Sequence, residues 1–332
     1  MKAMVIDKYG KAPMRLTDVP TPNIGEYEIL AEIHAASINP IDFKIRDGKA
    51  KLLIKYEMPL ILGNDFSGVV VKVGAKVSRF KVGDDIYARP RKSKIGTFAE
   101  FIAIHEDDIA LKPKNLSFEE AASIPLVGLT SYQALHDIMQ LQTGQKVLIH
   151  AGSGGVGTFA IQLAKLMGAT VATTASEAGA NLVTTLGADE VINYKTEKFE
   201  ELLENYDAVF DTLGGTTLEK SFGIIKPGGK IVSVSGLPNA RFAKEYGSGF
   251  LKRLLFSAAS YKLTALEKKH DVHYSFLFMK PSGEQLRMIA DYIESGKIKP
   301  VIDRIFPFEE AQQAMEYAES GRAKGKIIVK IK

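Results

Sequence analysis

Residues 146–157 read KVLIHAGSGGVG, a short apolar run that passes directly into a glycine-rich turn. The apolar run predicts a buried β-strand. Beyond the turn, Val156, Ala160 and Leu163 repeat with helical spacing, which predicts a helix over residues 155–167. A strand, a tight glycine turn and a helix in immediate succession form the opening unit of a doubly wound α/β fold.

Three glycines, Gly152, Gly154 and Gly157, place the spacing G-x-G-x-x-G between this strand and this helix. In such a unit the first glycine permits the tight turn, the second admits a pyrophosphate to the backbone, and the third lets helix and strand pack closely. The free N–H groups at the start of the helix attract the phosphates. A merely tight turn is the alternative, but this context favours dinucleotide binding. The residues predicted to hold the cofactor here are Gly152, Ser153, Gly154, Gly155, Val156 and Gly157.

Outward from this unit, strand-like and helix-like segments alternate as far as residue 234. The alternation predicts a parallel sheet covered by helices on both faces. We expect strands at residues 170–174, 190–193, 208–211 and 230–234, with helices at 180–186 and 197–205. Residues 241–273 interrupt the pattern and predict a helical insertion, followed by one more strand at 275–279. The aromatic side chains of the insertion are expected in the core or, alternatively, over the binding site; they are Phe242, Tyr246, Phe250, Phe256 and Tyr261.

The first 120 or so residues have a different character. Short strands separated by Gly, Pro or charged residues predict a barrel-like sheet. We expect these strands at residues 4–6, 27–33, 66–74, 82–88 and 98–103. The tail returns to this part of the fold with a helix at 308–319 and a strand at 326–329. The fold class is therefore α/β, a doubly wound parallel sheet with a second, barrel-like domain.

Composition narrows the range of functions. A chain of 332 residues is expected to form about two domains. Its formal net charge of +4 does not indicate a nucleic-acid binder or a membrane-surface protein. The absence of cysteine excludes disulfides, thiolate catalysis and cysteine-ligated zinc. With no targeting segment at residues 1–7 and no long apolar run, we expect a soluble, cytoplasmic protein.

The choice between NAD(H) and NADP(H) depends on the end of the second strand of the unit, where the cofactor ribose is read. Residues 171–176 (VATTAS) end without the Asp or Glu that would bind a ribose diol, and small hydroxyl side chains leave room for a 2′-phosphate. We therefore predict NADP(H), with Ser176 and Tyr194 near the phosphate. Glu177 is evidence in the other direction, because its carboxylate could bind a diol or repel a phosphate.

Several further segments resemble one enzyme family. Residues 37–44 (SINPIDFK), 62–68 (LGNDFSG) and 121–132 (AASIPLVGLTSY) are similar to signatures of the zinc-independent quinone oxidoreductase branch of the medium-chain dehydrogenase/reductase superfamily. Residues 213–215 and 226–230 complete the set. The resemblance spans nearly the whole chain. It extends to the reticulon-interacting mitochondrial oxidoreductases, which share patterns like those at residues 273–281 and 296–301.

The resemblance implies a domain plan and a reaction. It implies a discontinuous GroES-like catalytic domain at residues 1–121 and 300–332, a Rossmann NADP-binding domain at 122–299, and a possible homodimer. The expected reaction is NADPH-dependent hydride transfer to quinones or α,β-unsaturated carbonyls without a metal, because the cofactor carries the chemistry. Further cofactor contacts expected on this basis are Thr130, Leu213, Gly236, Phe276 and Phe278. A helix cap is the alternative role for the Thr130 hydroxyl.

The resemblance also bears on zinc. Zinc-dependent members of the superfamily place a cysteine where Asn39 stands and a histidine where Asn64 stands. Amide side chains are poor zinc ligands, so we predict no metal site. The six histidines lack metal-ligand spacing and are expected to be structural, with His150 next to the glycine loop as the least certain of them.

Candidate catalytic residues lie around the first motif. Asn39 and Asp42 are predicted to shape the nicotinamide end of the site, and a turn set by Asn39-Pro40 is the alternative. Lys44 could bind the cofactor ribose or polarise a carbonyl, or it could be a solvated helix residue. Tyr56 is a hypothetical proton donor, with water as the alternative. Arg89, Arg91, Lys92 and Lys94 are expected in a solvated loop or, alternatively, at the rim of the substrate entrance.

Two other functions remain open at this stage. A zinc-type alcohol dehydrogenase is disfavoured by the two asparagines and by the missing cysteines. A dinucleotide-binding redox sensor with little turnover would have the same cofactor motifs. Turnover with a panel of quinones and enones distinguishes an enzyme from a sensor.

Overall fold

The computed structural model describes residues 1–247 and 249–332, which divide into two compact units. The discontinuous unit consists of Met1–Leu129 and Lys280–Lys332. The continuous unit consists of Thr130–Met279. The two units are described separately below.

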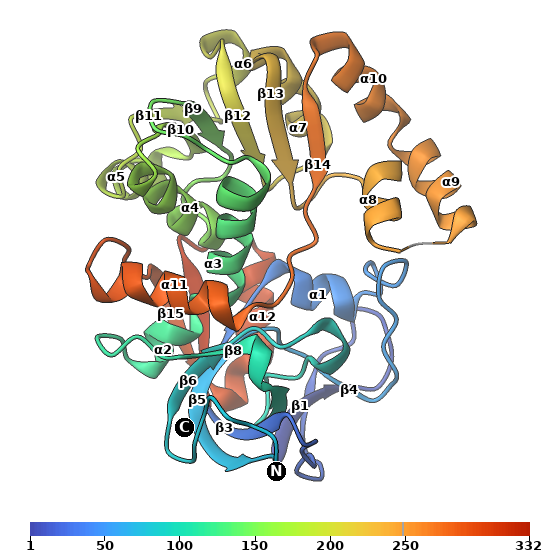
Figure 1. Ribbon diagram of the computed structural model, residues 1–332, viewed down its shortest axis with the longest axis vertical. Coiled ribbons are helices and arrows are strands. Elements are labelled where there is room, and N and C mark those ends of the chain that lie inside the picture. Colours follow the sequence, from blue (N-terminus) through green and yellow to red (C-terminus); the bar gives the residue numbers. More distant parts are fainter. Residues whose placement is uncertain (248) are drawn as a thin grey trace. The chain divides into compact units, whose positions relative to one another are not determined.

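The continuous unit is built on a parallel six-stranded sheet with the order β11-β10-β9-β12-β13-β14 (Figure 1). Numbered within the sheet, this is the order 3-2-1-4-5-6 of a dinucleotide-binding fold. The predicted parallel sheet is therefore confirmed. Its strands are β9 (Lys146–Ile149), β10 (Thr170–Ala175), β11 (Glu190–Asn193), β12 (Tyr206–Asp211), β13 (Ile225–Ser233) and β14 (His273–Phe276).

The helices of this unit follow the strands as the apolar spacing predicts. Helix α4 begins directly after the glycine turn and buries Phe159, Ala160 and Leu163. Helix α6 is shorter than the predicted 197–205, because Leu203 is already extended and leads the chain into β12. The helices here are α3 (Pro125–Tyr132, which crosses the unit boundary), η3 (Gln133–Ile138), α4 (Gly155–Leu166), α5 (Glu177–Thr185), α6 (Phe199–Leu202), α7 (Gly215–Ser221) and η4 (Phe222–Ile224).

The segment between β13 and the edge strand β14 is helical, as predicted for the insertion. It forms α8 (Ala240–Glu245), α9 (Phe250–Ala259) and α10 (Tyr261–His270). In Figure 1 these helices, drawn in orange, lie beyond β14, and α9 is the outermost of the three. Phe242 and Phe256 are buried, whereas Phe250 and Tyr261 are 73% and 75% exposed. Tyr246 is also exposed, so the expectation of a core position is wrong for Tyr246, Phe250 and Tyr261.

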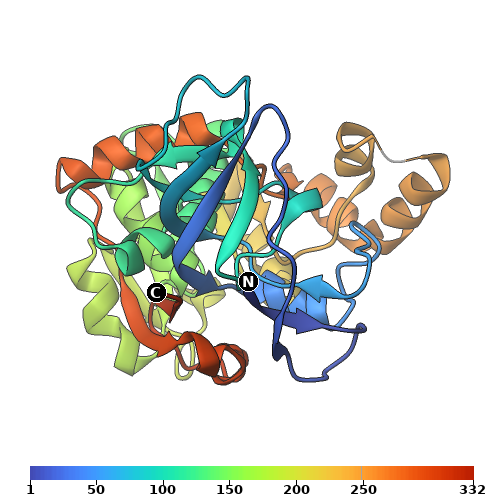
Figure 2. The ribbon, with the colours of Figure 1, turned by 90° about the horizontal axis from the view of Figure 1, so that it is seen from below.

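The discontinuous unit contains two sheets. The larger has the order β15-β16-β3-β5-β6-β8, with β7 also paired to β3, and the smaller has the order β2-β1-β4. The C-terminal strand β16 pairs antiparallel with β3, which brings the red end of the chain beside the blue and cyan strands (Figure 2). The strands are β1 (Lys2–Ile6), β2 (Arg15–Asp18), β3 (Glu28–Ile38), β4 (Leu60–Ile61), β5 (Phe66–Val73), β6 (Asp85–Ala88), β7 (Phe101–His105), β8 (Ile109–Leu111), β15 (Ile302–Pro307) and β16 (Lys326–Lys330).

Strand β3 shows why this sheet forms. Its first eight residues alternate between partly buried and buried positions, as expected for a strand with one face on a core. That core includes Ile29, Ile33, Phe66, Ile86 and Val329. The helices of the unit are α1 (Pro40–Arg46), η1 (Lys92–Lys94), η2 (Glu106–Asp108), α2 (Phe118–Ala122), α11 (Gly283–Glu294), η5 (Phe308–Glu310) and α12 (Ala311–Glu319).

The boundary of the discontinuous unit at Lys280 reflects the packing of α11. This helix packs against β8, and a Cβ on its first residue, Gly283, would lie only 2.1 Å from the Ile109 carbonyl oxygen. The Tyr87 hydroxyl also donates to the Leu286 carbonyl at 2.5 Å. The sequence-based domain boundaries, 121/122 and 299/300, differ from this division and stay a prediction.

Candidate functional site

The glycine turn after β9 is packed more tightly than any larger residue would allow. A Cβ on Gly152 would lie 2.1 Å from the Thr173 hydroxyl oxygen, and one on Gly157 would lie 2.5 Å from the Ala151 carbonyl oxygen. Gly154 is different, because its nearest neighbour is the Ala151 carbonyl at 3.3 Å. The chain itself thus explains the first and third glycines. Packing within the chain does not require a glycine at position 154. A glycine there fits a backbone that is left open for a phosphate.

Helix α4 starts at this turn with its N-terminus uncapped by any side chain. Its N-cap residue is Gly154, in extended conformation, and the helix runs for 12 residues. The first N–H groups of a helix lack intrahelical partners and carry partial positive charge. The turn and the helix end together therefore form a cradle that fits a pyrophosphate.

Apart from Thr130 in helix α3, the residues predicted to contact the cofactor lie at or after the carboxyl ends of strands in this one sheet. Parallel strands end at the same edge, and ligands of doubly wound folds bind there. Gly152 to Gly157 follow β9, Ser176 follows β10, Tyr194 follows β11, Leu213 follows β12, Gly236 follows β13, and Phe276 and Phe278 close β14. The sheet thus brings these residues to one edge, while their contacts with a cofactor stay a prediction.

Two of these loops are tied to a single buried carboxylate, Asp211 at the end of β12. Its oxygens accept the backbone N–H groups of Leu213 and Gly214 at 3.0 to 3.1 Å. Asp211 also accepts the Ser233 hydroxyl at 2.5 Å, and that hydroxyl oxygen in turn accepts the N–H of Gly236 at 2.7 Å. One side chain therefore holds the loops after β12 and β13 in a fixed relation.

The predicted 2′-phosphate region lies after β10 and β11. These strands are paired through Ala175 and Asn193, so the residues that follow them, Ser176 and Tyr194, emerge side by side. Tyr194 is 60% exposed. Lys195 is also exposed and places a cation next to Tyr194, whereas the exposed Glu177 places an anion beside Ser176.

His150 ends β9 immediately before the glycine turn and is completely buried. Its Nε2 lies 2.9 Å from the Ser221 hydroxyl, and its Nδ1 lies 3.4 Å from the Thr174 hydroxyl. Burial lowers the pKa of His150 to about 4. The imidazole is therefore neutral at pH 7. Its contacts with the hydroxyls of Ser221 and Thr174 agree with the expected structural role.

A second polar site lies in the discontinuous unit, at the end of β3. The carboxylate of Asp65 accepts hydrogen bonds from the Ser37 hydroxyl at 2.6 Å and from the Asn39 amide Nδ2 at 2.9 Å. Lys326, from β16, donates to Asn39 Oδ1 at 2.5 Å and lies 3.8 Å from Asp65. All four residues are buried. Burial lowers the pKa of Lys326.

The same network continues through Asp42. Its carboxylate accepts the Asn39 backbone N–H at 2.7 Å and the Asn64 amide Nδ2 at 2.7 Å. Burial, opposed by the Asn64 hydrogen bond and helped by the charge of Asp65, raises the pKa of Asp42 to about 7. Asn39-Pro40 starts helix α1, so Asp42 binds the backbone at a helix start. The structural alternative and the predicted site role are thus both compatible with this geometry.

Arg89 completes the network, and its position corrects the expectation of a solvated loop. The guanidinium is only 4% exposed and donates to Asn64 Oδ1 at 3.2 Å and to the Pro90 carbonyl at 2.6 Å. Among the described residues, its Nε has no hydrogen-bond partner. Arg91 forms an ion pair with Asp108, and Lys94 forms one with Glu28. These two ion pairs fix the side chains of Arg91 and Lys94. Burial, followed by the charge of Arg89, lowers the pKa of Lys92 to about 7.

The structure defines the roles of three other predicted residues less closely. Lys44 lies on α1 two residues after Asp42, and burial lowers its pKa. The backbone of Tyr56 exchanges two hydrogen bonds with the Tyr9 hydroxyl, at 2.7 and 3.0 Å. Thr130 is the sixth residue of α3 and is buried, which excludes the alternative of an N-terminal helix cap.

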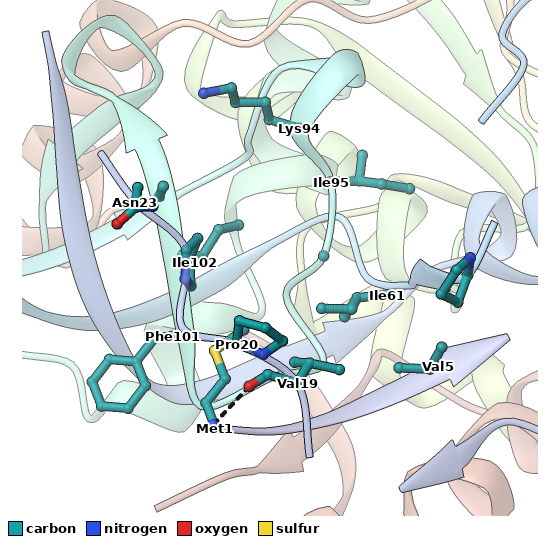
Figure 3. Close-up of a pocket in the computed structure, with 14 residues that line it drawn as sticks. Met1, Val5, Val19, Pro20, Asn23, Ile61, Lys94, Ile95, Phe101 and Ile102 are labelled. Atoms are coloured by element: carbon teal, nitrogen blue, oxygen red, sulfur yellow. Dashed lines mark hydrogen bonds between the residues drawn. The ribbon is translucent and has the colours of Figure 1, made fainter. Parts of the chain in front are cut away.

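The discontinuous unit also has an apolar pocket of about 460 Å³ beside β1 and β4 (Figure 3). Val5, Ile61 and Ile102 are among its lining residues, and the Met1 amino group donates to the Val19 carbonyl at its edge at 2.9 Å. The charged side chain in its lining is Lys94, which pairs with Glu28. The pocket shares no residue with the Asn39–Asp42 network and offers no acid–base pair.

Known protein families match segments of both units. The family models for the alcohol dehydrogenase GroES-like domain and for zinc-binding dehydrogenases match residues 25–114 and 186–329. The chain is 37% identical to the mitochondrial NAD(P)H oxidoreductase RTN4IP1 of Homo sapiens, across 100% of this chain and 89% of that protein. It is 36% identical to the chloroplastic NADPH-dependent alkenal/one oxidoreductase of Arabidopsis thaliana, across 99% and 79%. The solved structure of the quinone oxidoreductase from Coxiella burnetii superposes with a TM-score of 0.87 at 35% identity, covering 100% and 99%.

The chain belongs to the medium-chain dehydrogenase/reductase superfamily. The resemblance seen in the sequence and the predicted GroES-like and Rossmann parts are thereby confirmed. The expected cytoplasmic location is not supported in the same way, because these relatives are named as mitochondrial or chloroplastic. No helix within residues 1–247 and 249–332 is long and apolar enough to cross a membrane.

The zinc that the superfamily implies does not fit the donors of this member. At the two positions in question, the amide nitrogens of Asn39 and Asn64 donate to the carboxylates of Asp65 and Asp42. Asn39 Oδ1 is engaged by the Lys326 ammonium. Zinc prefers thiolate, imidazole or carboxylate, and a lysine cation in their midst opposes a second cation.

Sequence analysis missed several residues that organise these sites. Lys326 and Asp65 lie far from Asn39 in the chain, and only strand pairing brings them together. Asp211 and Ser233 end strands and could have been found as polar residues at the carboxyl ends of an apolar run. Lys195 could have been found as a cation adjacent to the predicted Tyr194.

Proposed function

We propose that this protein is an NADPH-dependent reductase that transfers hydride to quinones or α,β-unsaturated carbonyl compounds without a metal. The observation that carries the proposal is the pyrophosphate cradle at Gly152–Gly157, and the Asn39–Asp42 network, whose amides are unsuited to zinc, supports the absence of a metal from the reaction. The names of the relatives, among them an NADPH-dependent alkenal/one oxidoreductase and a quinone oxidoreductase, support it.

NADP(H) fits the residues of the continuous unit. The uncapped start of α4 would hold the pyrophosphate, and Ser176, Tyr194 and Lys195 would face a 2′-phosphate. Leu213 and Gly236, on the loops that Asp211 fixes, would border the cofactor. When bound, the nicotinamide supplies the hydride, which adds to a carbon polarised by a conjugated carbonyl.

The protein's own part is then to hold geometry and charge. Asn39 is held by hydrogen bonds with Asp65 and Lys326, and Asp42 by one with Asn64, so this network is pre-organised. Lys44 is proposed to bind the ribose or the substrate carbonyl. Tyr56 is proposed to deliver the proton to the α-carbon, and a loss of less than about tenfold in Tyr56→Phe would assign that step to water instead.

Purified protein should oxidise NADPH in the presence of a panel of quinones and conjugated enones, monitored by the loss of NADPH absorbance. Saturated ketones should give no oxidation, and turnover of NADPH with them would contradict the proposal. Tight NADPH binding without turnover of any panel member would favour a redox sensor instead. A homodimer and a cytoplasmic location stay predictions that size measurements and cell fractionation can check.

A further inference from the structure

Arg89, the residue that follows β6, is a buried cation whose hydrogen bonds go to neutral groups. It is 4% exposed, and its guanidinium donates to Asn64 Oδ1 and to the Pro90 carbonyl. Within residues 1–247 and 249–332, its Nε has no hydrogen-bond partner and no carboxylate forms an ion pair with it. A guanidinium stays charged in proteins, so its burial without a counter-ion is costly. A buried, unpartnered N–H on a permanent cation is therefore suited to bind an anion.

The carboxylates whose charges act on this guanidinium are engaged elsewhere. The ammonium of Lys326 lies 3.8 Å from Asp65, and Arg91 pairs with Asp108 at 2.8 Å. Burial is the main cause that raises the pKa of Asp42 to about 7, so this carboxyl is only about half ionised at pH 7. Among the described residues, the guanidinium charge is thus left without a counter-ion of its own.

Two lysines add positive charge beside Arg89. Lys92 is the first residue of η1, three positions after Arg89, and it is half-buried. Lys280 is exposed and lies three positions before the start of α11. Burial, followed by the charges of Arg89 and Lys280, lowers the pKa of Lys92 to about 7, so both cations act on its ammonium. All three residues belong to the discontinuous unit, where their charges together attract an anion.

This group of cations is connected to the network that the proposed function uses. Arg89 donates to Asn64 at 3.2 Å, and Asn64 donates to Asp42 at 2.7 Å. The phenol of Tyr56, the proposed proton donor, also acts on the charge of Arg89. An anion bound by Arg89 would therefore lie beside residues that the reductase proposal assigns to the substrate.

We propose that Arg89, Lys92 and Lys280 form a subsite that binds a carboxylate carried by the substrate. The inference rests on the proposed reductase function, and it narrows the substrate class to conjugated carbonyl compounds with an acidic group. Arg89 Nε would donate a charge-assisted hydrogen bond to the carboxylate, and the two ammonium groups would add attraction. The acidic group would thereby orient the conjugated bond before the hydride is transferred.

The first test compares a charged enone with a neutral one of similar size. The compound 4-oxo-2-pentenoate carries a carboxylate where 3-hexene-2,5-dione carries an acetyl group. The ratio of their kcat/KM values with NADPH is measured in the unchanged protein and in each variant, so that the intrinsic reactivities of the two compounds cancel. Arg89→Gln has an amide that can still donate to Asn64, and it should lower this ratio about tenfold to a hundredfold.

Two lysine variants complete this comparison. Lys280→Gln changes an exposed side chain, so it is expected to fold even if Arg89→Gln does not, and it should lower the ratio about twofold to fivefold. Lys76→Gln is the matched control, because Lys76 is an exposed lysine of the same unit that pairs with Glu26. An unchanged ratio in Lys280→Gln, or an equal fall in Lys76→Gln, would overturn the proposal.

A binding measurement separates the subsite from the reductase activity. Calorimetric titration with the saturated ketones 4-oxopentanoate and 2,5-hexanedione should show at least about tenfold tighter binding of the charged compound, and Arg89→Gln should remove this difference. Equal affinities of the two ketones, or inorganic phosphate binding as tightly as 4-oxopentanoate, would overturn the carboxylate subsite. Charge-dependent binding without turnover of any enone would instead overturn the reductase proposal, and with it the substrate class inferred here.

Discussion

The two polar sites of this molecule are built in opposite ways. In the continuous unit, the site is mainly backbone, a row of loops after the strands of one parallel sheet, with Asp211 holding two of them. In the discontinuous unit, the site is a buried network of side chains. Its members come from β3, α1, the start of β5, the end of β6 and the C-terminal strand β16.

The difference shows how each site obtains its precision. The shape of a backbone cradle depends on where strands end and on positions that have room only for glycine. It therefore depends on a few close contacts. A side-chain network is set by charge balance among buried groups, so the loss of one partner leaves another buried group unpaired. The two sites should therefore respond differently to substitution and to pH.

The largest effect is expected from Lys326→Met. This change leaves the buried Asp65 without its nearby cation, and it removes the ammonium that donates a hydrogen bond to Asn39 Oδ1. The free energy of unfolding should fall by about 3–5 kcal/mol. Lys330→Met, which removes the exposed pair with Glu119 on the same strand, should cost at most about 1 kcal/mol. Urea unfolding measures the stability of both variants. Equal losses would mean that the charge of Lys326 does not stabilise the buried network.

Asp42→Asn should change the pH dependence of stability. The folded-state pKa of Asp42 is raised to about 7, so the folded protein retains a proton that the unfolded chain releases near pH 4. Stability supplied by this group is therefore lost as the pH rises from about 4 to about 7, by about 4 kcal/mol in total. The variant should lose this slope, whereas exposed Asp18→Asn should retain it in unfolding curves measured at several pH values.

His150→Gln tests the opposite sign in the other unit. The folded-state pKa of His150 is lowered by burial to about 4, so its contribution is present above the unfolded pKa of about 6.5 and is lost as the pH falls towards 4. The loss amounts to about 3 kcal/mol at pH 4. The variant should flatten the acid limb of the stability curve, and the exposed His136→Gln should leave it intact. An unchanged acid limb in His150→Gln would show that His150 is charged in the folded state.

Gly157→Ala tests the backbone cradle. The added Cβ would overlap the Ala151 carbonyl and Gly152, so the turn must open, and NADPH affinity should fall about a hundredfold, or about 2.7 kcal/mol. Gly223→Ala meets nothing within 4 Å and is the matched control. Fluorescence titration with NADPH measures both. Wild-type affinity in Gly157→Ala would show that the close packing of the turn is not needed for binding.

The smallest effect is expected from Lys195→Ala. Removing an exposed cation beside Tyr194 should weaken NADPH binding about fivefold to tenfold and leave NADH binding unchanged. Lys198→Ala, on an exposed lysine that pairs with Glu201, is the control. Equal losses for both cofactors would place the 2′-phosphate elsewhere.

The same contrast explains what the sequence could predict. The glycine spacing and the alternation of strands and helices give the continuous unit and its cofactor loops, because both depend on local order in the chain. The sequence identifies the Asn39–Asp42 segment as a site and offers Arg89 only as an alternative at a substrate entrance, but it does not identify Asp65 and Lys326 as partners of that segment. Their proximity depends on antiparallel pairing between strands far apart in the chain, which no local pattern encodes.

The insertion shows a second limit. Its composition predicts helices, and its aromatic residues are expected in the core or, alternatively, over the binding site. The structure buries Phe242 and Phe256 and leaves Phe250 outside. The spacing of apolar residues identifies a helix face but not the medium that the face contacts, whether protein core or another surface.

The pairing of β16 with β3 also sets an order for biosynthesis. Residues 130–279, the continuous unit, are all synthesised before β16. The network around Asp65 is completed later, because Lys326 follows Asn39 by 287 residues in the chain. A nascent chain therefore carries Asn39 and Asp65 without their cation until β16 has been synthesised, and a truncation before Lys326 would leave this network incomplete although Asn39 and Asp65 are present.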